Sequence, residues 1–520
     1  MQRSGVTHRD VLRLGATASL SATPLSAADS AWSSMVDNTL STIPAPPPAA
    51  TEEICFLGAT ELAAQIRAKK ISVREVMSAH LRQIDRVNSK VNAIVTMVPE
   101  VDLITQALAA DEALAKGAAA GPLYGLPVAI KDAVETKGIR TTCGSPLFRD
   151  YVPDHDAPVV ERMKNAGAIV IGKTNVPEFS MGSQTFNTVF GATLNPYDPS
   201  KTCGGSTGGG AVALACGMAP IVNGTDMGGS LRNPANFCNV VGIRPSPGRV
   251  PNSPATQLAW SGLSVQGPMA RNVTDLALLL SVQAGFDRRS PLSIDQPGSL
   301  FSRPLGRSFK GIRLAMIKDF GLPWEPPVLA AFEAQRKVFE SLGCIVEQAE
   351  PDMRDATDCF LAWRHRSYEL QLGAHVDAHP DKVNAYGHWH VEQGRNLTGP
   401  YLSSIEAKHS ALYQRFQEFT DTYEFLILPV NQVLPFDVHT HYPTEIAGVK
   451  MENYVAWMKS AYYISIVGSP AMSVPCAFSS TGLPIGIQIV GRLNDDWGVL
   501  RLGYAFEQAT GIGKKRPVVV

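Results

Sequence analysis

Two serines and one lysine are the residues of this chain whose types and settings could support nucleophilic chemistry. Ser206 lies in the run Gly-Gly-Ser-Thr-Gly-Gly-Gly, and Ser230 ends the run Gly-Thr-Asp-Met-Gly-Gly-Ser. Glycine lets the main chain approach a ligand closely, so N–H groups in such runs can point at one oxygen and hold an oxyanion. Lys131 ends a short apolar run and could act as the base that a serine nucleophile needs.

The Lys131 side chain can accept a proton only when its amine is neutral. Its pKa must therefore fall by about three units from the usual value of about 10.4, at a cost of about 4 kcal/mol. Burial away from acids supplies such a shift, because it disfavours the charged form. The apolar, β-prone run that starts at Pro122 predicts a buried strand with Lys131 at its end.

Two familiar motifs compete for the glycine-rich run. Residues 204–208 match the Gly-x-Ser-x-Gly pattern of a nucleophile elbow, which requires a strand before the serine and a helix after it. The preceding residues, Asn195–Ser200, are interrupted by prolines and predict turns. A phosphate loop requires a Lys-Ser or Lys-Thr pair that the run lacks. Neither motif explains the run.

Histidines raise the alternative of a metal site. His375 and His379 have the spacing of ligands on one helix face, but Pro380 interrupts that helix and no glutamate lies between the two histidines. Four further histidines are His388, His390, His439 and His441. We expect solvated surface histidines, one of which could line a pocket, and neither a metal nor another cofactor.

The combination of Lys131, Ser206 and Ser230 resembles the amidase signature family. The glycine- and serine-rich signature is matched from Gly204 to Val250. Matching segments outside it are 125–132, 172–179 and 482–486. The resemblance extends roughly from residue 55 to residue 515 and implies one large layered α/β domain over residues 51–520, with a central mixed β-sheet covered by helices on both faces.

The resemblance also implies a role for each residue of a Ser-Ser-Lys triad. Ser230 would be the nucleophile, Ser206 would follow a cis peptide bond and relay a proton, and Lys131 would be the base. The implied oxyanion hole consists of the backbone N–H groups of Met227, Gly228, Gly229 and Ser230. Removing one such donor typically costs 10²- to 10³-fold in rate.

Four residues beside the implied triad are expected to support it or to modify it. Asp226 and Arg232 would fix the loop through charge-assisted hydrogen bonds, and the alternative is a surface pair worth under about 1 kcal/mol. Met227 stands where the family usually has threonine, and Thr207 stands where a second serine is common. Because neither departure removes a triad residue, we expect effects on substrate preference or rate.

The implied function is hydrolysis of a carboxylic amide C–N bond through an acyl-enzyme, with esters and carbamates open to the same route. Two alternatives stay open: the glutamine-hydrolysing subunit of an amidotransferase, and a non-catalytic binding protein on the same scaffold. The expected partner is a small-molecule amide, and a homodimer is left open. An aryl or bulky apolar amide is the preferred substrate class.

Alternating helical and strand-like patterns along the chain independently predict an α/β layered fold. A capping box at Ser72–Glu75 predicts the start of one helix. Other helices are expected from residue 60 and at 101–116, 158–166, 274–284 and 328–342. Buried strands are expected at 168–171, 312–317, 344–347, 425–428, 471–474 and 485–490.

Residues 352–470 are expected to form, in part, a helical cover over the active site. The aromatic residues predicted to line the substrate pocket are Trp363, Tyr368, Tyr386, Trp389, Tyr401, Trp457 and Tyr462. The alternative is that these rings belong to the core, where aromatic residues at helical spacing are more common.

Composition limits the classes of function. With 45% hydrophobic and 18% charged residues, the 520-residue chain is typical of globular proteins. A net charge of -1 without a long basic run argues against binding of nucleic acid. No apolar run reaches the roughly 18 residues of a membrane-spanning helix. Eight cysteines without a Cys-x-x-Cys pair predict isolated buried thiols rather than disulfides or a zinc site.

Residues 1–50 are expected to lie outside the folded domain. Residues 7–28 resemble a twin-arginine export signal in which His8 replaces the first arginine, so a periplasmic and a cytoplasmic location both stay open. The Pro-, Ser- and Ala-rich residues that follow, up to Thr51, predict an unstructured tether.

Overall fold

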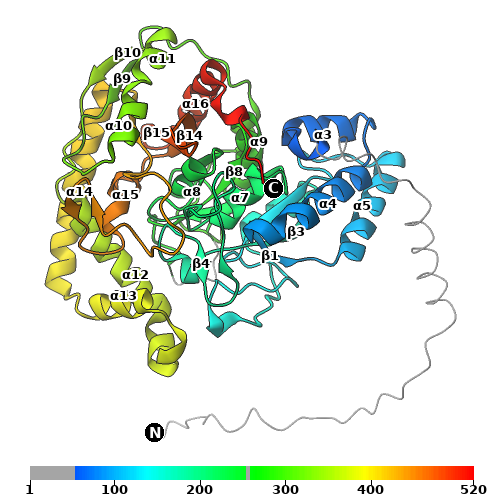
Figure 1. Ribbon diagram of the computed structural model, residues 1–520, viewed down its shortest axis with the longest axis horizontal. Helices are drawn as coiled ribbons and strands as arrows, with labels where there is room; N and C mark the ends of the chain where they lie inside the picture. The colour runs from blue at the N-terminus through cyan, green and yellow to red at the C-terminus, as the bar shows by residue number, and fades with distance from the viewer. Residues whose placement is uncertain (1–52, 253–257, 520) are drawn as a thin grey trace, which may run out of the picture. The chain divides into compact units, whose positions relative to one another are not determined.

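The computed structural model describes residues 53–252 and 258–519, and all of them belong to one compact unit (Figure 1). The predicted export signal and tether lie outside the described residues. Eleven described strands form one sheet in the order β1-β3-β2-β6-β8-β7-β14-β15-β11-β9-β10. These strands are β1 (Ile94–Met97), β2 (Pro127–Lys131), β3 (Ile169–Thr174), β6 (Ile221–Asp226), β7 (Val241–Arg244), β8 (Val265–Ala270), β9 (Arg313–Met316), β10 (Ile345–Gln348), β11 (Phe425–Pro429), β14 (Ala471–Phe478) and β15 (Pro484–Val490).

The helices are distributed along the whole described chain. The α-helices are α3 (Ala59–Arg67), α4 (Val73–Val91), α5 (Glu100–Ala115), α6 (Pro158–Asn165), α7 (Gly208–Ala215), α8 (Arg232–Phe237), α9 (Val273–Gln283), α10 (Pro326–Glu333), α11 (Arg336–Ser341), α12 (Ala356–Ala378), α13 (Ala385–Arg395), α14 (Gly399–Thr422), α15 (Lys459–Ile466) and α16 (Asp496–Thr510). Short 3₁₀ helices are Pro146–Phe148, Glu178–Ser180, Gly298–Ser302, Pro380–Lys382, Ala456–Met458 and Ile512–Lys514. Two small ladders pair β4 (Phe186–Asn187) with β5 (Gly191–Ala192) and β12 (Glu445–Ile446) with β13 (Val449–Lys450).

The sheet is mixed, as the predicted fold class requires. Strand β2 runs parallel to both β3 and β6. Each successive pair in the series β6, β8, β7, β14, β15 and β11 is antiparallel. Strands β11, β9 and β10 are again parallel. The prediction of a mixed central sheet in an α/β fold is confirmed.

Close contacts at two glycines place helices on opposite faces of the sheet. A Cβ added to Gly242 in β7 would lie 3.2 Å from the Cβ of Ala235, so α8 packs against this residue. A Cβ added to Gly503 in α16 would collide with the side chain of Met472 in β14. Gly242 pairs with Ser473, the direct neighbour of Met472. Because successive residues of a strand point to opposite faces, α8 and α16 cover opposite faces.

The described helices largely follow the predicted patterns. Ser72 caps α4 with the predicted box, since it accepts from the Glu75 N–H while the Glu75 side chain accepts from the Ser72 N–H. The single helix predicted at 328–342 is wrong in one respect, because α10 ends at Glu333 and α11 begins at Arg336. Helices α13, α14 and α15 all pack against α12 (Figure 1).

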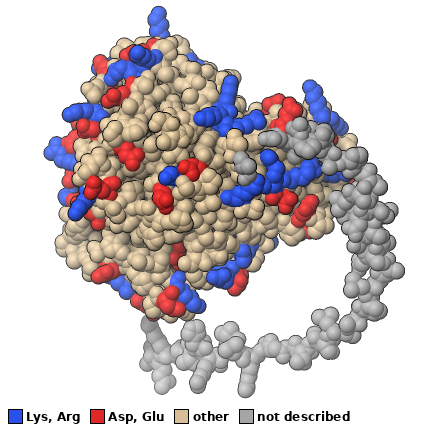
Figure 2. Space-filling view, viewed as in Figure 1, with Lys and Arg blue, Asp and Glu red and all other residues tan. Residues whose placement is uncertain are grey.

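The surface charges, the helix lengths and the cysteines can be compared with what the composition predicted. Lysine and arginine side chains are interspersed with aspartate and glutamate over the face shown in Figure 2. Within the described ranges, every helix is too short or too polar to span a bilayer. The eight cysteines, all in the described part of the chain, form no disulfide, and the buried-thiol prediction is confirmed for seven of them, whereas Cys143 is half-buried.

Candidate active site

Ser230 lies in a tight turn between a strand and a helix. Strand β6 ends at Asp226, and the chain passes through Gly228 and Gly229 to Ser230 just before α8 begins. Gly229 has φ +116, and a Cβ there would lie 2.6 Å from the Asn233 side chain. Only glycine fits this turn without strain. The side chain of Ser230 is largely buried, with 8% of the residue exposed.

Ser206 lies in a second turn that the chain joins to the first. The peptide bond between Gly205 and Ser206 is cis, as the resemblance implied. Thr207 follows, and its N–H donates to the carbonyl of Ser230 at 3.1 Å. Helix α7 begins at Gly208, but an isolated bridge at Thr202, not a strand, precedes the turn. The strand that a nucleophile elbow requires is therefore missing before Ser206 within the described chain.

Lys131 reaches Ser206 from the end of β2, and the strand predicted to carry it is confirmed. Every residue of β2 is buried, and Lys131 is fully inaccessible to solvent. Its Nζ lies 2.6 Å from Ser206 Oγ and donates to Thr225 Oγ1 at 2.7 Å. Sequence reasoning missed Thr225, since a single threonine in a polar stretch carries no motif.

The electrostatics of Lys131 match the demand of a base. Burial lowers the pKa of Lys131 to about 7, although the Asp226 carboxylate opposes the shift. The expectation of burial away from acids is therefore wrong for Asp226. The pKa of Lys131 still reaches the predicted range, because the effect of burial is larger than that of the carboxylate.

Asp226 and Arg232 form a fully buried ion pair, so the alternative of a surface pair is wrong. Arg232 Nη2 donates to Asp226 Oδ1 at 3.0 Å, and Arg244 Nη1 donates to the Asp226 carbonyl at 2.6 Å. Burial raises the pKa of Asp226, but the two guanidinium charges hold it well below its usual range. The carboxylate is ionised and accepts from the N–H groups of Gly229 and Leu231 at 2.9 and 3.1 Å. It therefore pins the turn that ends at Ser230.

This contact corrects the predicted oxyanion hole at one position. The N–H of Gly229 already donates to Asp226, so this donor orders the turn and is not open to a ligand in this structure. Among the described residues, the N–H groups of Met227, Gly228 and Ser230 have no acceptor. These three donors remain available to an oxyanion.

Both serines open into one cavity of about 190 Å³. Its lining comes from many segments, namely Ala133, Cys143, Phe179, Ser180, Ser206, Thr225, Met227, Ser230, Asn252, Leu258, Ser261, Ser264, Gln266, Tyr368, Gln371 and Leu372. None of these side chains carries a formal charge at neutral pH. Burial raises the pKa of the Cys143 thiol to about 12, which keeps that sulfur protonated.

The aromatic prediction is correct for one ring only. Tyr368 of α12 lines the cavity. Trp457 and Tyr462 are buried in the hydrophobic core, and Tyr401 is exposed. The other three predicted rings, Trp363, Tyr386 and Trp389, lie outside the lining. The sequence could not identify the residues that do line the cavity, because they are far apart along the chain.

One histidine contradicts the expectation of a solvated surface. His390 is fully buried and lies 2.9 Å, Nδ1 to Nδ1, from His365. The ring of His375 packs edge-on against Phe148 at 5.5 Å between centroids.

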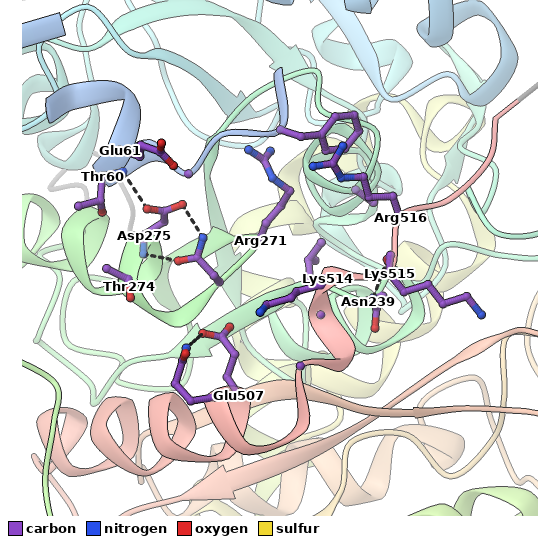
Figure 3. A pocket seen from close by; sticks show the side chains of 18 of the residues that line it. Thr60, Glu61, Asn239, Arg271, Thr274, Asp275, Glu507, Lys514, Lys515 and Arg516 are labelled. Atoms are coloured by element: carbon purple, nitrogen blue, oxygen red, sulfur yellow. Dashed lines mark hydrogen bonds between the residues drawn. The ribbon is translucent and has the colours of Figure 1, made fainter. Parts of the chain in front are cut away.

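A larger cavity of about 660 Å³ lies elsewhere, between α3, α9 and the C-terminal residues (Figure 3). Three of its ionisable side chains bond to the backbone of neighbouring segments. Asp275 accepts from the N–H groups of Ala59 and Thr60 at 2.8 Å, and Arg271 donates to backbone carbonyls, including that of Leu57 at 2.7 Å. Glu507 accepts from the N–H of Val273 at 3.0 Å. Neither candidate serine borders this cavity, so its size does not make it the reaction site.

Comparisons with known proteins agree with this architecture. The amidase family matches residues 75–500. A glutamyl-tRNA(Gln) amidotransferase subunit of Alkaliphilus metalliredigens (strain QYMF) is 34% identical over 488 residues, covering 86% of this chain and 95% of the relative. A crystal structure of a bacterial aryl acylamidase superposes with TM-score 0.83 at 25% identity, covering 89% of this chain and 99% of the other. A crystal structure of an amidase superposes with TM-score 0.78 at 27% identity, covering 88% and 100%.

The chain belongs to the amidase signature family. It is an enzyme of the class that acts on amide C–N bonds, and its fold is that of the solved amidase signature structures.

Proposed function

We propose that this protein hydrolyses a neutral carboxylic amide through an acyl-enzyme, with Ser230 as the nucleophile. Lys131, with its neutral amine, takes a proton from Ser206 across the 2.6 Å contact while Ser206 takes the proton of Ser230. Ser230 Oγ then forms a bond to the carbonyl carbon, and the C=O π electrons move to the oxygen. Collapse of this tetrahedral intermediate breaks the C–N bond, and the relay delivers the proton to the leaving nitrogen.

The second half of the cycle reuses the same groups. Water loses a proton to the relay as it attacks the acyl carbon, and Ser230 recovers its proton when the acid leaves. The N–H groups of Met227, Gly228 and Ser230 receive the oxyanion in both halves, which their lack of another acceptor among the described residues supports. Thr207 supports the geometry, because its N–H holds the carbonyl of Ser230.

The uncharged lining of the cavity is the observation that carries the choice of a neutral amide. Free glutamine would bring an ammonium and a carboxylate into the cavity, and buried charges are costly without partners. The described residues of the lining offer only hydroxyl, amide, thiol, thioether and apolar side chains. Phe179, Leu258 and Tyr368 favour an aryl or bulky apolar group on one side of the scissile bond. Esters and carbamates of similar shape fit the same route.

A hydrolysis panel tests this proposal. The purified chain is assayed on aliphatic, aryl, peptide C-terminal and carbamate substrates beside the Ser230→Ala variant. Turnover of an uncharged amide that the variant lacks supports the proposal. Absence of turnover on every neutral amide would contradict it.

Inhibitor labelling tests the choice of nucleophile separately. An acyl-trapping inhibitor should label Ser230, located by mass spectrometry of the digested protein. Labelling of Ser206 instead would reverse the roles proposed for the two serines.

The 34% identity to amidotransferase subunits favours one second candidate, a glutamine-hydrolysing subunit that passes ammonia to a partner-held acceptor. This candidate predicts that glutamine is preferred over simple amides and that a partner protein raises its hydrolysis. Glutamine and an uncharged amide of similar size, compared at equal concentrations, separate the two functions.

A further inference from the structure

One arginine behind the candidate active site lacks a carboxylate partner among the described residues. Arg364 lies on α12, and only 3% of its surface is exposed. Its hydrogen bonds go to His390, Tyr454 and Met227, none of which is an acid. Burying an unpaired cation is costly, so the groups around it must be arranged to stabilise the charge.

The hydrogen bonds around Arg364 fix the protonation of their partners. Arg364 Nε donates to His390 Nε2 at 3.2 Å, so His390 Nε2 is an acceptor and its Nδ1 carries the proton. Nδ1 therefore donates to His365 Nδ1 at 2.9 Å. Tyr454 OH accepts from Arg364 Nη2 at 3.0 Å and lies 2.5 Å from His390 Nε2. The network is neutral apart from the guanidinium, which keeps its full positive charge.

Two residues stand between this cation and the substrate cavity. Arg364 Nη1 lies 3.2 Å from Met227 Sδ, and the guanidinium lies 4.9 Å from the centroid of the Tyr368 ring. Met227 and Tyr368 line the cavity that contains Ser206 and Ser230. Arg364 itself is not part of the lining. The Met227 thioether thus covers the side of the Arg364 guanidinium that faces the cavity.

We propose that Met227 and Arg364 together set the charge specificity of the cavity, and that Met227 keeps a latent carboxylate-binding site closed. With the thioether in place the wall is apolar and favours uncharged amides. Shortening Met227 exposes the guanidinium, which then pairs with a carboxylate on the substrate. The inference rests on the amide hydrolysis proposed above for its catalytic readout, and it concerns specificity rather than the bond that is broken.

The expected size of the effect follows from the pairing. A hydrogen bond to a charged group contributes enough to change a rate or affinity ratio about 10- to 100-fold, and a guanidinium–carboxylate pair is of this kind. The Met227→Ala variant should therefore gain this factor for a substrate with a carboxylate relative to its uncharged counterpart. Met227→Leu keeps the cap and is the matched control.

The catalytic test uses two pairs of substrates, one for each side of the amide that could face Met227. N-succinyl-4-nitroanilide and N-butyryl-4-nitroanilide differ by a carboxylate on the acyl side. 4-Acetamidobenzoate and 4-methylacetanilide differ by a carboxylate on the amine side. The kcat/KM ratio within a pair should rise about 10- to 100-fold in Met227→Ala for one pair, stay within about twofold in Met227→Leu, and return to its original value in Met227→Ala/Arg364→Met.

A binding measurement tests the same step without turnover. Calorimetric titration of pentanoate and of uncharged pentan-1-ol into Met227→Ala and Met227→Leu needs no substitution of Arg364, so it holds even where the double variant fails to fold. A preference for pentanoate over pentan-1-ol in Met227→Ala that Met227→Leu lacks supports the proposal. An equal preference in the two variants, or hydrolysis of the uncharged substrates with unchanged ratios in both pairs, overturns it. Loss of all hydrolysis with preferential pentanoate binding to Met227→Ala would instead refute the proposed function and leave the specificity site standing.

Discussion

The hydroxyl of Thr225 should tune the pH at which the enzyme becomes active. Lys131 Nζ donates to Thr225 Oγ1 at 2.7 Å, and the charged ammonium donates more strongly than the neutral amine. The contact therefore favours protonated Lys131 and opposes the effect of burial. Replacing Thr225 with valine keeps the shape of the side chain and removes the acceptor, so the pKa of Lys131 should fall.

The size of the shift follows from the strength of one hydrogen bond. The pKa of Lys131 is about 7, which predicts an acid limb of kcat/KM near pH 7 in the native enzyme. A hydrogen bond to a charged group contributes about 1.5–3 kcal/mol, and about 1.4 kcal/mol corresponds to one pKa unit. Because the neutral amine keeps part of the bond, we expect the limb to move down by about one unit in Thr225→Val.

The assay is the pH dependence of kcat/KM for the best neutral amide from the panel, between about pH 5 and pH 9. Thr225→Ser keeps the hydroxyl and should retain the limb near pH 7. The value of kcat/KM on the plateau at high pH depends on how the lysine is positioned, so it is compared separately from the position of the limb. The reasoning fails if Thr225→Val leaves the limb in place or moves it to higher pH, or if the native enzyme shows no limb near pH 7.

Three further predictions concern the nucleophile, the turn and a buried histidine. Ser230→Ala should lower kcat by about 10⁴- to 10⁶-fold with an unchanged melting temperature, measured by product release and circular dichroism. Gly229→Ala should destabilise the fold by about 1–3 kcal/mol in urea unfolding, because its φ is +116 and the new Cβ would meet Asn233, and a neutral effect would contradict the strain argument. Burial lowers the pKa of His80 to about 4, below its value of 6.5 in the unfolded chain, so the unfolded state binds more protons and stability should fall between pH 6.5 and about 4. Urea unfolding at both ends of that window should show a smaller difference in His80→Gln.

The sequence predicted elements wherever local pattern and burial agree. Strand β2 is apolar and fully buried, so its continuous apolar run, with Lys131 at the end, could be recognised in the sequence. The start of α4 was equally clear, since Ser72 and Glu75 form the capping box within one turn.

Strands β6 and β8 were missed for the opposite reason. Strand β6 ends in Asn-Gly-Thr-Asp and β8 contains Gly267 and Pro268, so neither shows an apolar run, although both lie in the middle of the sheet. Asn223 of β6 is buried without a hydrogen-bond partner for its side chain among the described residues. Polar residues tolerated inside a sheet near a reaction site cannot be distinguished from turn residues by periodicity.

The same gap explains why Thr225 and the cavity walls were not predicted. Leu258, Leu372 and Phe179 meet only because the chain folds, and no short-range pattern relates them. Ser206, Ser230 and Lys131 were accessible from the sequence because their settings are local, glycine-rich for the two serines and an apolar strand for the lysine.

Strand β6, which the sequence pattern did not predict, distinguishes the two serines. The Gly-x-Ser-x-Gly pattern surrounds Ser206, yet the strand–turn–helix arrangement that such a pattern normally serves surrounds Ser230, between β6 and α8. Asp226, at the end of β6, interacts both with this turn and with Lys131. Its carboxylate accepts from the Gly229 N–H and raises the pKa of Lys131 against the larger effect of burial. Two buried guanidinium groups pair with this carboxylate, and burial of Lys131 outweighs the effect of the carboxylate's charge, so one acid can order the turn of Ser230 while the lysine beside it still titrates near neutral pH.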